Sequence, residues 1–567
     1  MTTRRFWACL TAILLLALLL RTLFPSADPP WRSTVGIVWH DEGAWVHNAR
    51  NKALFGGWRQ DAWNPVFIAP VFTALEYASF SAFGVGVRQA RLVSELAGLM
   101  SVLLLALGVR RIAGARAGVF AAALLATDYV YVMYNRAAIM EALMASLIVA
   151  SWYFSTRAER DPRWGALAGV MATLAFFTKA AAAFYVGALG LAMVWHLLDR
   201  RTGPDSVRPQ AGRIAIAMWT LGGLAAAFMI VAAAFVVPHW TDYQFYNWQV
   251  SVTRKPSYDL TSILQRVTWF PILHDTFSRL WPVLVLATLG AWGIVVRWRR
   301  AMDGERLLLL WVAVGSLELL VHDVGNERRF VFLIPALVAL AALVLTRGTL
   351  LPADAGSIPR RAVLICAPVL LYSTYVLAGP VARLPFLDEV RAHVLRHAVR
   401  VAAGMAVLAS ALLIVAWPRV ASRTTRSAWP PRLVDVAVVL FTAWNLGQFA
   451  DWARQRTYEN EQASQAIGRA LPPGTLVQGK LANGLALENR IRPIFIGHQF
   501  GNYADRKERD DVRYILTYTD PEIGHEGDQI VDVLAAYPGW RIIMTFDVAE
   551  TPSGHDKAAL IEKRARH

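Results

Sequence analysis

Residues 6–24 read FWACLTAILLLALLLRTLF, a largely apolar run that carries one charge, Arg21, near its end. A helix needs about 20 apolar residues to cross the hydrocarbon core of a bilayer, so this run predicts a first membrane helix. It follows Arg4 and Arg5, as the apolar part of a signal peptide would. Pro25 comes next instead of a small-residue cleavage site, so we expect the helix to be retained.

The composition also indicates a membrane protein. Of the 567 residues, 56% are hydrophobic and 17% are charged, whereas soluble proteins carry roughly 25% charged residues. A formal net charge of +16 is also found in proteins that bind nucleic acid. Here the arginines lie in short segments between apolar runs and not on one basic face. We therefore expect the lipid bilayer, and no nucleic acid, as a partner.

Similar runs recur along the chain and predict an α-helical polytopic membrane protein with about 13 transmembrane helices. They lie near residues 6–24, 89–109, 117–135, 141–156, 164–184, 185–199, 214–237, 280–296, 307–321, 330–346, 361–378, 396–417 and 433–450. With a cytoplasmic N-terminus, every predicted inside loop contains arginine, as the positive-inside rule requires. We therefore expect a multi-pass protein of the cell inner (plasma) membrane whose C-terminus lies outside.

The predicted membrane domain covers residues 1–451. Its first outer loop, 25–88, contains a stretch, Asp41–Phe55, that suits an amphipathic helix along the membrane surface. The apolar stretch Val66–Gly84 contains Pro70 and Glu76, so we expect a helix that lies in the outer interface and does not span.

Two further regions lie on the predicted outer face. Residues 238–279 form an aromatic and polar outer loop, typical of a membrane interface. Residues 452–567 have mixed charge and short strand-like runs, such as 512–518, separated by helical patterns. They predict a small C-terminal α/β domain in the periplasm or the extracellular space.

Seven charged residues interrupt the apolar pattern, and all of them fall on the predicted outer face. They are Asp41, Glu42, Arg136, Glu141, Lys179, Arg328 and Arg329. Ionisable residues next to lipid are costly and usually functional. Carboxylates can act as general bases, and guanidinium groups bind phosphate bidentately. We therefore expect these side chains to converge in one outer cavity that binds an anionic lipid headgroup.

Each of these charges also has a purely structural interpretation, which the sequence leaves open. The acidic pair suits a helix N-terminus, where the helix dipole favours negative charge. A lysine near the end of a span can extend to the interface. The arginines can pair with acids close to them in sequence: Arg136 with Glu141, and Arg328 and Arg329 with Glu327 or Asp323.

At these residues the chain resembles the GT-C membrane glycosyltransferases that use polyprenyl-phosphate sugars. The most similar groups are the aminoarabinose transferases of lipid A and the protein O-mannosyltransferases, and the chain thus resembles glycosyltransferase family 39. The resemblance covers residues 1–350 well and the rest only in layout. It rests on the order of Asp41-Glu42, Pro65 to Gly84 with Arg88 and Arg91, Arg136 with Glu141, Phe177-Thr178-Lys179, and Arg328-Arg329-Phe330 with Pro335.

The resemblance implies a hexosyl- or pentosyltransferase that moves a sugar from a polyprenyl-phosphate donor to an acceptor on the periplasmic face, with inversion. In that family the first-loop acid is a catalytic carboxylate. Carried over, Asp41 is the general base, with Glu42 and Glu141 as further catalytic acids. The residues that would bind the donor phosphate are Arg136, Lys179, Arg328 and Arg329. We expect no cofactor and no metal site, although the acidic pair leaves a divalent metal open.

Three departures from the lipid A enzymes leave the acceptor open among protein, lipid and glycan. They are Asn64 before Pro65, Gly43-Ala44-Trp45 after the acidic pair, and Phe330 after the arginines. The alternative function is a transporter or lipid-linked sugar flippase without transfer chemistry, and a third is a non-catalytic assembly protein. Transporters place polar groups near the membrane midplane. Because the charges here cluster at one face, the sequence favours the transferase.

Overall fold

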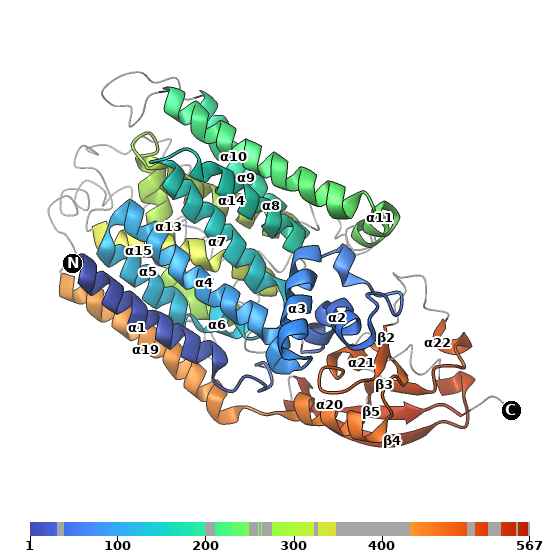
Figure 1. Ribbon diagram of the computed structural model, residues 1–567. Coiled ribbons are helices and arrows are strands. Elements are labelled where there is room, and N and C mark those ends of the chain that lie inside the picture. Colours follow the sequence, from blue (N-terminus) through green and yellow to red (C-terminus); the bar gives the residue numbers. More distant parts are fainter. Residues whose placement is uncertain are drawn as a thin grey trace.

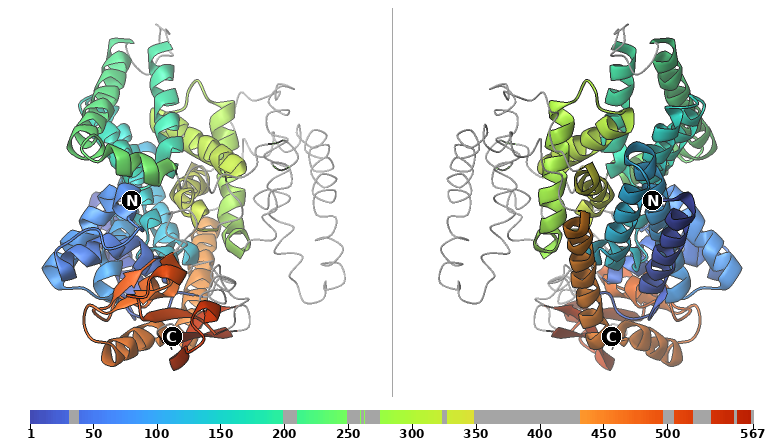
Figure 2. Two further views of the ribbon diagram at one scale, coloured as in Figure 1. Left: turned by 90° about the vertical axis from the view of Figure 1, so that its right-hand side faces the viewer. Right: turned by 90° about the vertical axis from the view of Figure 1, so that its left-hand side faces the viewer.

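The computed structural model describes residues 1–30, 39–198, 210–248, 275–322, 327–347, 431–495, 505–519, 534–551 and 554–564, with the single residues 259 and 262. Most of the described chain is helical, and Figure 1 shows a helical bundle with a β-sheet at one of its ends. The side views in Figure 2 place the sheet at the same end. Two of the predicted spans, 361–378 and 396–417, lie outside the described residues.

The bundle contains most of the long helices of the described chain, together with the short α6. They are α1 (Thr3–Thr22), α4 (Val87–Ala113), α5 (Ala115–Thr127), α6 (Tyr129–Asn135), α7 (Met140–Ala158), α8 (Trp164–Thr178), α9 (Ala183–Leu198), α10 (Gln210–Val231), α13 (Asp275–Val296), α14 (Asp303–His322), α15 (Ile334–Arg347) and α19 (Pro431–Gln455). Short 3₁₀ segments precede α9 and α15, at Ala180–Ala182 (η2) and Glu327–Phe332 (η7). A π-helical turn, Ala232–Val236 (η3), and α11 (Trp240–Trp248) follow α10.

The apolar helices have the length and surface of membrane spans. Within the described residues, five helices are long and apolar enough to cross a membrane, or six if the bent pair α5–α6 is one span. Large apolar side chains point outward from them, with Leu15, Met218 and Leu440 at least 62% exposed. A soluble domain rarely exposes so many. The chain is therefore a membrane protein, while the expected total of 13 spans stays a prediction.

Two predicted spans are interrupted. The run 117–135 forms two helices bent by 63°, because Asp128 at the break accepts the backbone N–H of Tyr131 and starts α6. The run 164–184 stops at Thr178, after which Lys179 has an extended backbone. Sequence periodicity runs through both breaks, so it could not locate them.

The arginine of the first apolar run is part of the bundle core. Arg21 is fully buried and donates to the side-chain oxygen of Asn135, at 2.9 Å, and to the carbonyl of Ala126, at 3.3 Å. These bonds satisfy a charge that would otherwise be costly to bury. They also hold α1 against α5 and α6.

The C-terminal part of the chain contains a five-stranded mixed sheet of order β2-β1-β3-β5-β4. The strands are β1 (Leu476–Gln478), β2 (Arg492–Ile494), β3 (Tyr514–Tyr518), β4 (Arg541–Thr551) and β5 (Gly554–Glu562). Strand β1 is parallel to β2 and β3, and β5 pairs antiparallel with β3 and β4. Helices α20 (Glu459–Ala470), α21 (Lys480–Gly484) and α22 (Asp505–Glu508) accompany the sheet.

Helices α2 (His40–Phe55) and α3 (Pro70–Phe83), with the 3₁₀ turn η1 (Pro65–Phe67) between them, lie between the bundle and the sheet (Figure 1). At 1.5 Å per residue, the 14 residues of α3 span about 21 Å, less than the roughly 30 Å of a bilayer core. This length agrees with a helix that does not cross the membrane.

Helix α2 is not the surface helix that its sequence suggests. Most of its residues are buried, and α21 packs directly against it. The contact is so close that a Cβ on Gly43 would lie 1.8 Å from the carbonyl oxygen of Asn483. The side chain of Arg50 is also buried, and it donates to the carbonyls of Ala486, Asn489 and Ile491. Burial of the polar face of α2 by a segment over 400 residues later was invisible in the local sequence pattern.

Candidate active site

Four charged side chains from four separate elements meet next to α2. Asp41 lies in the first turn of α2 and Glu141 in the first turn of α7, where the helix dipole favours an acid. Lys179 directly follows the last residue of α8, where the dipole favours a cation. Arg328 lies in η7, just before α15. We call these four residues the ion-pair cluster.

Opposite charges alternate through the ion-pair cluster. The guanidinium of Arg328 donates to a carboxylate oxygen of Asp41, and its Nε lies 3.4 Å from Oε1 of Glu141. The ammonium of Lys179 donates to that same Glu141 oxygen at 2.5 Å. Glu141 therefore holds both cations, and Arg328 connects it to Asp41.

The ion-pair cluster is shielded from solvent but not sealed. The side chain of Glu141 is 1% exposed, whereas those of Lys179, Asp41 and Arg328 are 17–18% exposed. Electrostatic interactions are stronger in such a site than in water. The two cations and Asp41 are therefore partly exposed, while Glu141 is buried.

Arg329 lies beside the ion-pair cluster and faces a different group. Its guanidinium donates to the carbonyl of His322 at 3.0 Å, at the end of α14. Its positive charge also acts on Lys179. It is close enough to add to the local positive potential.

Glu42 points away from its neighbour Asp41. It accepts two hydrogen bonds from Arg91, at 2.8 and 2.7 Å, and one from the backbone N–H of Ala138, at 2.9 Å. The same arginine donates to the carbonyls of Pro25 and Ala27. Glu42 therefore ties α2 to α4 and to the turn before α7, which fixes the direction in which Asp41 points.

Arg136 is not brought into the ion-pair cluster. It donates to the carbonyls of Leu20, Arg21 and Phe24 at the end of α1, and it stacks on the Trp452 ring at 4.6 Å. The carbonyls at a helix C-terminus lack intrahelical donors and favour positive charge. In this geometry Arg136 holds α1, α6 and α19 together, and its placement supports a structural role.

Glu76 is a buried acid close to the site that the sequence marked only as an interruption of an apolar run. It is 0% exposed, and neither carboxylate oxygen has a hydrogen-bond partner among the described residues. Burial raises its pKa well above the ordinary value, and the negative charge of Glu42 adds to the shift. Both effects favour the protonated, neutral form of this carboxyl group.

Two of the residues that depart from the lipid A enzymes, Asn64 and Phe330, are buried in the structure. Asn64 is fully buried, accepts from the Asn48 amide at 2.9 Å and donates to the Tyr246 hydroxyl at 2.7 Å, so it joins α2 to α11. Phe330 is buried beside the arginines of η7. Neither residue offers a charge to a ligand.

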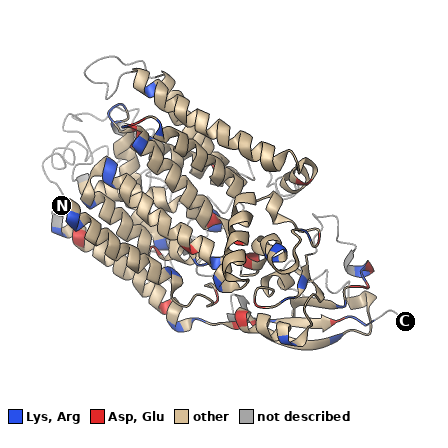
Figure 3. Cartoon of the chain, in the orientation of Figure 1, with Lys and Arg blue, Asp and Glu red and all other residues tan. Residues whose placement is uncertain are grey.

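Acidic and histidine side chains do not gather into a metal site in the part of the chain that the structure describes. No group of three or more His, Cys, Asp or Glu residues there could hold a metal ion. Figure 3 shows acids and bases mixed around α2 and α3, with long uncharged stretches along the bundle helices. Among the described residues, the acids Asp41, Glu42 and Glu141 form ion pairs with arginine and lysine side chains.

Known proteins resemble this chain in part of its sequence and in its whole fold. Residues 68–240 match the family model described as dolichyl-phosphate-mannose-protein mannosyltransferase. Among curated protein sequences, none matches the chain significantly.

Solved structures resemble it over its full length. ArnT from Cupriavidus metallidurans, bound to undecaprenyl phosphate, has a TM-score of 0.54 at 15% identity, with 99% of this chain and 98% of that chain covered. Its apo form gives 0.53 at 16% identity, with the same coverage. The oligosaccharyltransferase of Archaeoglobus fulgidus has a TM-score of 0.46 at 14% identity, and the match covers 98% of this chain and 74% of that chain.

The resemblance found in the sequence is therefore confirmed at the level of fold. The structure is similar in fold to ArnT, with 99% of this chain covered at a TM-score of 0.54. Its central part matches a mannosyltransferase family model as well. The protein has the GT-C fold of membrane glycosyltransferases.

Proposed function

We propose that the protein transfers a sugar from a polyprenyl-phosphate donor to an acceptor on the periplasmic face of the inner membrane. The observation that carries this proposal is the ion-pair cluster, in which the partly exposed Asp41 is paired with Arg328, and Glu141 connects Arg328 to the partly exposed Lys179. The likeness to ArnT, solved with undecaprenyl phosphate, supports this class of donor. The proposed orientation rests on the positive-inside rule, which predicts that the arginine-rich loops lie in the cytoplasm.

The cations of the ion-pair cluster suit the leaving group. As the bond between the anomeric carbon and the phosphate oxygen breaks, its electron pair stays on the phosphate. Lys179, Arg328 and Arg329 would stabilise that charge, and cations held in place beforehand lower such a barrier. Glu141 would position Lys179 and Arg328, since one of its oxygens contacts both.

Asp41 suits the role of general base. The acceptor hydroxyl would attack the anomeric carbon from the face opposite the phosphate and pass its proton to Asp41, so one displacement inverts the centre. General-base catalysis contributes typically about 10²–10⁴-fold. Because Arg328 holds Asp41 in this structure, the donor phosphate would compete for the guanidinium and release the carboxylate for the acceptor.

Transfer by Asp41→Asn tests this function. The variant and wild type are reconstituted in proteoliposomes with labelled polyprenyl-phosphate sugar and extracted cell-surface glycoconjugates, and labelled product is followed by mass spectrometry. We expect a loss of about 10²-fold or more in the rate of transfer. The control is Asp242→Asn, which removes a carboxylate from a surface pair with Arg59.

Near wild-type transfer by Asp41→Asn contradicts the assignment of the base. Movement of the labelled lipid across the bilayer without any glycosylated product, in wild type, would instead support the flippase alternative. Donor binding without either reaction would support a non-catalytic assembly protein.

A further inference from the structure

A buried histidine of α2 lies outside the ion-pair cluster and makes polar contacts with two other segments of the chain. The side chain of His47 is 1% exposed, as is that of Asp61 in the segment between α2 and η1. Its Nε2 lies 3.0 Å from a carboxylate oxygen of Asp61, and its Nδ1 lies 3.0 Å from the side-chain amide of Asn483 in α21. The amide group of Asn51, one turn later in α2, also lies 3.0 Å from Nε2. Burying these polar groups would be costly without the hydrogen bonds between them.

Asp61 connects His47 to two further backbone groups. The oxygen that faces His47 also accepts the backbone N–H of Trp63, at 3.1 Å, and the other oxygen accepts the N–H of Phe495, at 2.6 Å. Phe495 directly follows β2, 434 residues after Asp61. With the ring proton on Nε2, His47 donates to Asp61 and accepts from the amide of Asn483. We call His47, Asp61 and Asn483 the buried histidine network.

The contacts of α2 with the C-terminal part of the chain fall on one face of this helix. Trp39, Gly43, His47 and Arg50 follow one another at intervals of four, four and three residues, the spacing of a single helix face. Trp39 packs into the apolar core beside the sheet, and Arg50 donates to carbonyls of the loop between α21 and β2. Between them, Gly43 and His47 contact Asn483. The C-terminal part therefore holds α2 along most of its length.

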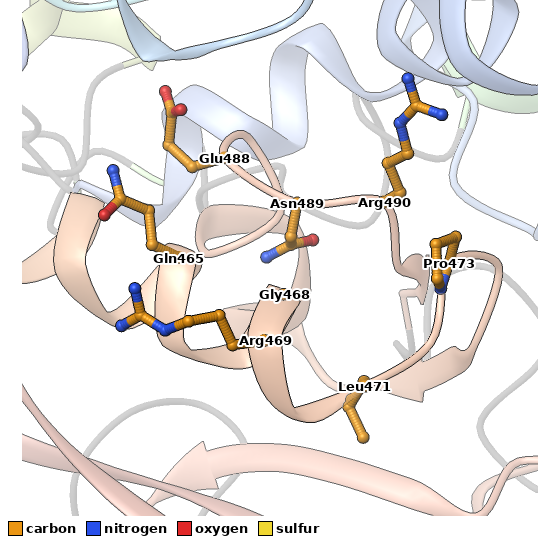
Figure 4. A pocket seen from close by; sticks show the side chains of 8 residues that line it. All are labelled: Gln465, Gly468, Arg469, Leu471, Pro473, Glu488, Asn489 and Arg490. Carbon is orange, nitrogen blue, oxygen red and sulfur yellow. The ribbon is translucent and has the colours of Figure 1, made fainter.

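The loop that holds Arg50 is itself fixed to a helix. In Figure 4 the side chain of Asn489 lies between this loop and α20. Its amide donates to the backbone carbonyl of Ser464 in α20, at 2.9 Å, and to that of Leu485, at 2.7 Å. Arg50 donates to the backbone carbonyl of the same Asn489, at 2.9 Å. Helix α2 is thus attached to an ordered part of the fold.

Asp41 belongs to α2, whereas its partners in the ion-pair cluster come from α7, η7 and the end of α8. It lies six residues before His47, about 9 Å along the helix axis. The pair of Glu42 with Arg91 fixes the start of α2 to the bundle, and the buried histidine network fixes its middle. Satisfied buried hydrogen bonds specify one arrangement. A tilt of α2 would move the Asp41 carboxylate relative to the cations.

We propose that His47 and Asp61 are positioning residues for the reaction, because they hold α2 at the angle that directs Asp41 toward the acceptor hydroxyl. The role of Asp41 as the base rests on the proposed function, whereas the attachment of α2 rests on the contacts of His47. Loss of the network leaves the cations of the ion-pair cluster in their own elements. It should therefore lower kcat and leave the KM for the donor nearly unchanged.

Two substitutions of His47 test this role. His47→Phe keeps an aromatic ring and removes the hydrogen bonds, whereas His47→Gln keeps an N–H group that can donate to Asp61. With labelled polyprenyl-phosphate sugar in proteoliposomes, we expect kcat of His47→Phe to fall about 10- to 10²-fold and the donor KM to stay within about twofold of wild type. His47→Gln should recover most of the lost kcat.

His196→Phe is the matched control. His196 is also a buried histidine beside an acid, with its Nε2 3.8 Å from Asp303, but it lies in the last turn of α9, away from α2. This variant should keep the kcat and KM of wild type. An equal fall in kcat for the two Phe variants, no recovery in His47→Gln, or an unchanged kcat in His47→Phe each overturns the positioning role.

A measurement without turnover tests the attachment of α2 by itself. Spin labels are placed at two exposed residues, Ala53 in α2 and Arg4 in α1, after Cys9 and Cys366 are replaced by serine. Pulsed electron paramagnetic resonance in detergent then gives the distribution of distances between the labels. We expect His47→Phe to broaden this distribution, and His47→Gln to keep it as narrow as in wild type. An unchanged distribution in His47→Phe overturns the proposal.

The two readouts separate this inference from the proposed function. Near wild-type transfer by Asp41→Asn removes the base and leaves the label distances of the His47 variants standing. Unchanged label distances remove the network and leave transfer at Asp41 standing. If His47→Phe does not fold, Asn483→Ala takes its place, because it removes one hydrogen bond of the network from outside α2. It should change kcat and the label distances in the same direction, and unchanged values overturn the proposal.

Discussion

Arg328 and Asp41, which are 287 residues apart in the chain, form an ion pair, and the same guanidinium lies 3.4 Å from Glu141. One cation thus contacts two acids that belong to different helices. A fork-shaped guanidinium can do this, whereas a compact ammonium cannot hold two carboxylates in fixed directions. The geometry around Arg328 therefore determines where both acids point.

Replacing Arg328 tests this geometry. In Arg328→Lys the charge is kept and the fork is lost, so we expect the KM for the donor to rise about tenfold. In Arg328→Ala the rate of transfer should fall about 10²–10³-fold, as when one donor to a developing oxyanion is removed. Steady-state kinetics in proteoliposomes measure both. Arg59→Ala removes a surface arginine that pairs with Asp242 and should change neither parameter.

Glu141→Gln should destabilise the protein. Its side chain is 1% exposed and holds Lys179 and Arg328, so the change removes the counter-charge of Lys179 and leaves Arg328 with Asp41 alone. Breaking a buried ion pair in this way costs about 3–5 kcal/mol, which thermal unfolding in detergent measures. Asp435→Asn, at a surface pair with Arg116, should cost about 1 kcal/mol or less.

A second substitution shows whether the Glu141 effect is electrostatic. If Lys179→Met is added to Glu141→Gln, part of the lost stability should return, because one uncompensated charge is removed. Additive losses in the double-mutant cycle would mean that the two side chains do not interact.

Glu76→Gln should change how stability depends on pH. Burial and the charge of Glu42 raise the pKa of Glu76 in the folded protein, so the folded state keeps a proton that the unfolded state releases above about pH 4.5. Stability of the wild type therefore falls with rising pH in this range, by up to about 1.4 kcal/mol per unit. The variant lacks this loss, so its stability relative to the wild type should increase as the pH rises above about 4.5. A difference in melting temperature that stays constant over this range would contradict a protonated Glu76.

Gly43→Ala tests the contact between α2 and α21. A Cβ at this position would lie 1.8 Å from the carbonyl oxygen of Asn483, so the helix must shift, at a cost of about 1–3 kcal/mol. Transfer should fall with it, since Asp41 is on the same helix. The matched control is Gly187→Ala in α9, where nothing lies within 4 Å and a slight gain in helix stability is expected. Equal effects of the two changes would show that the contact is not tight.

Much of the site could be predicted because charges are conspicuous in apolar sequence. Glu141 and Lys179 lie within predicted apolar spans, Asp41 and Arg328 lie in the outer segments beside them, and the structure brings these four together. The helical membrane architecture followed from the contrast between apolar spans and arginine-rich loops, whereas the GT-C type followed from the family resemblance.

What the sequence could not reveal depends on contacts between distant segments. Arg136, like Lys179, is a basic residue near the outer end of an apolar run. Its hydrogen-bond partners, however, are carbonyls at the end of α1. Glu42 and Asp41 are adjacent, yet they face Arg91 and Arg328 respectively. No local sequence pattern distinguishes an arginine that donates to carbonyls at a helix end from an arginine that binds a phosphate.

Helix ends were predicted less well than helices. The break at Lys179 lies inside a continuous apolar run, so hydropathy extends α8 to residue 184 although it ends at Thr178. The break matters for chemistry, because it removes Lys179 from the middle of a helix and places its ammonium against Glu141.

Binding of undecaprenyl phosphate, followed by native mass spectrometry of the purified protein, tests most directly whether the ion-pair cluster holds a lipid-linked phosphate. Wild type should retain one lipid, and undecaprenol, which lacks the phosphate, should not be retained. The folded fraction of Lys179→Gln/Arg328→Gln should lose undecaprenyl phosphate, and Lys52→Gln, at the exposed end of α2, should keep it. Equal retention by wild type and the double variant would contradict the account.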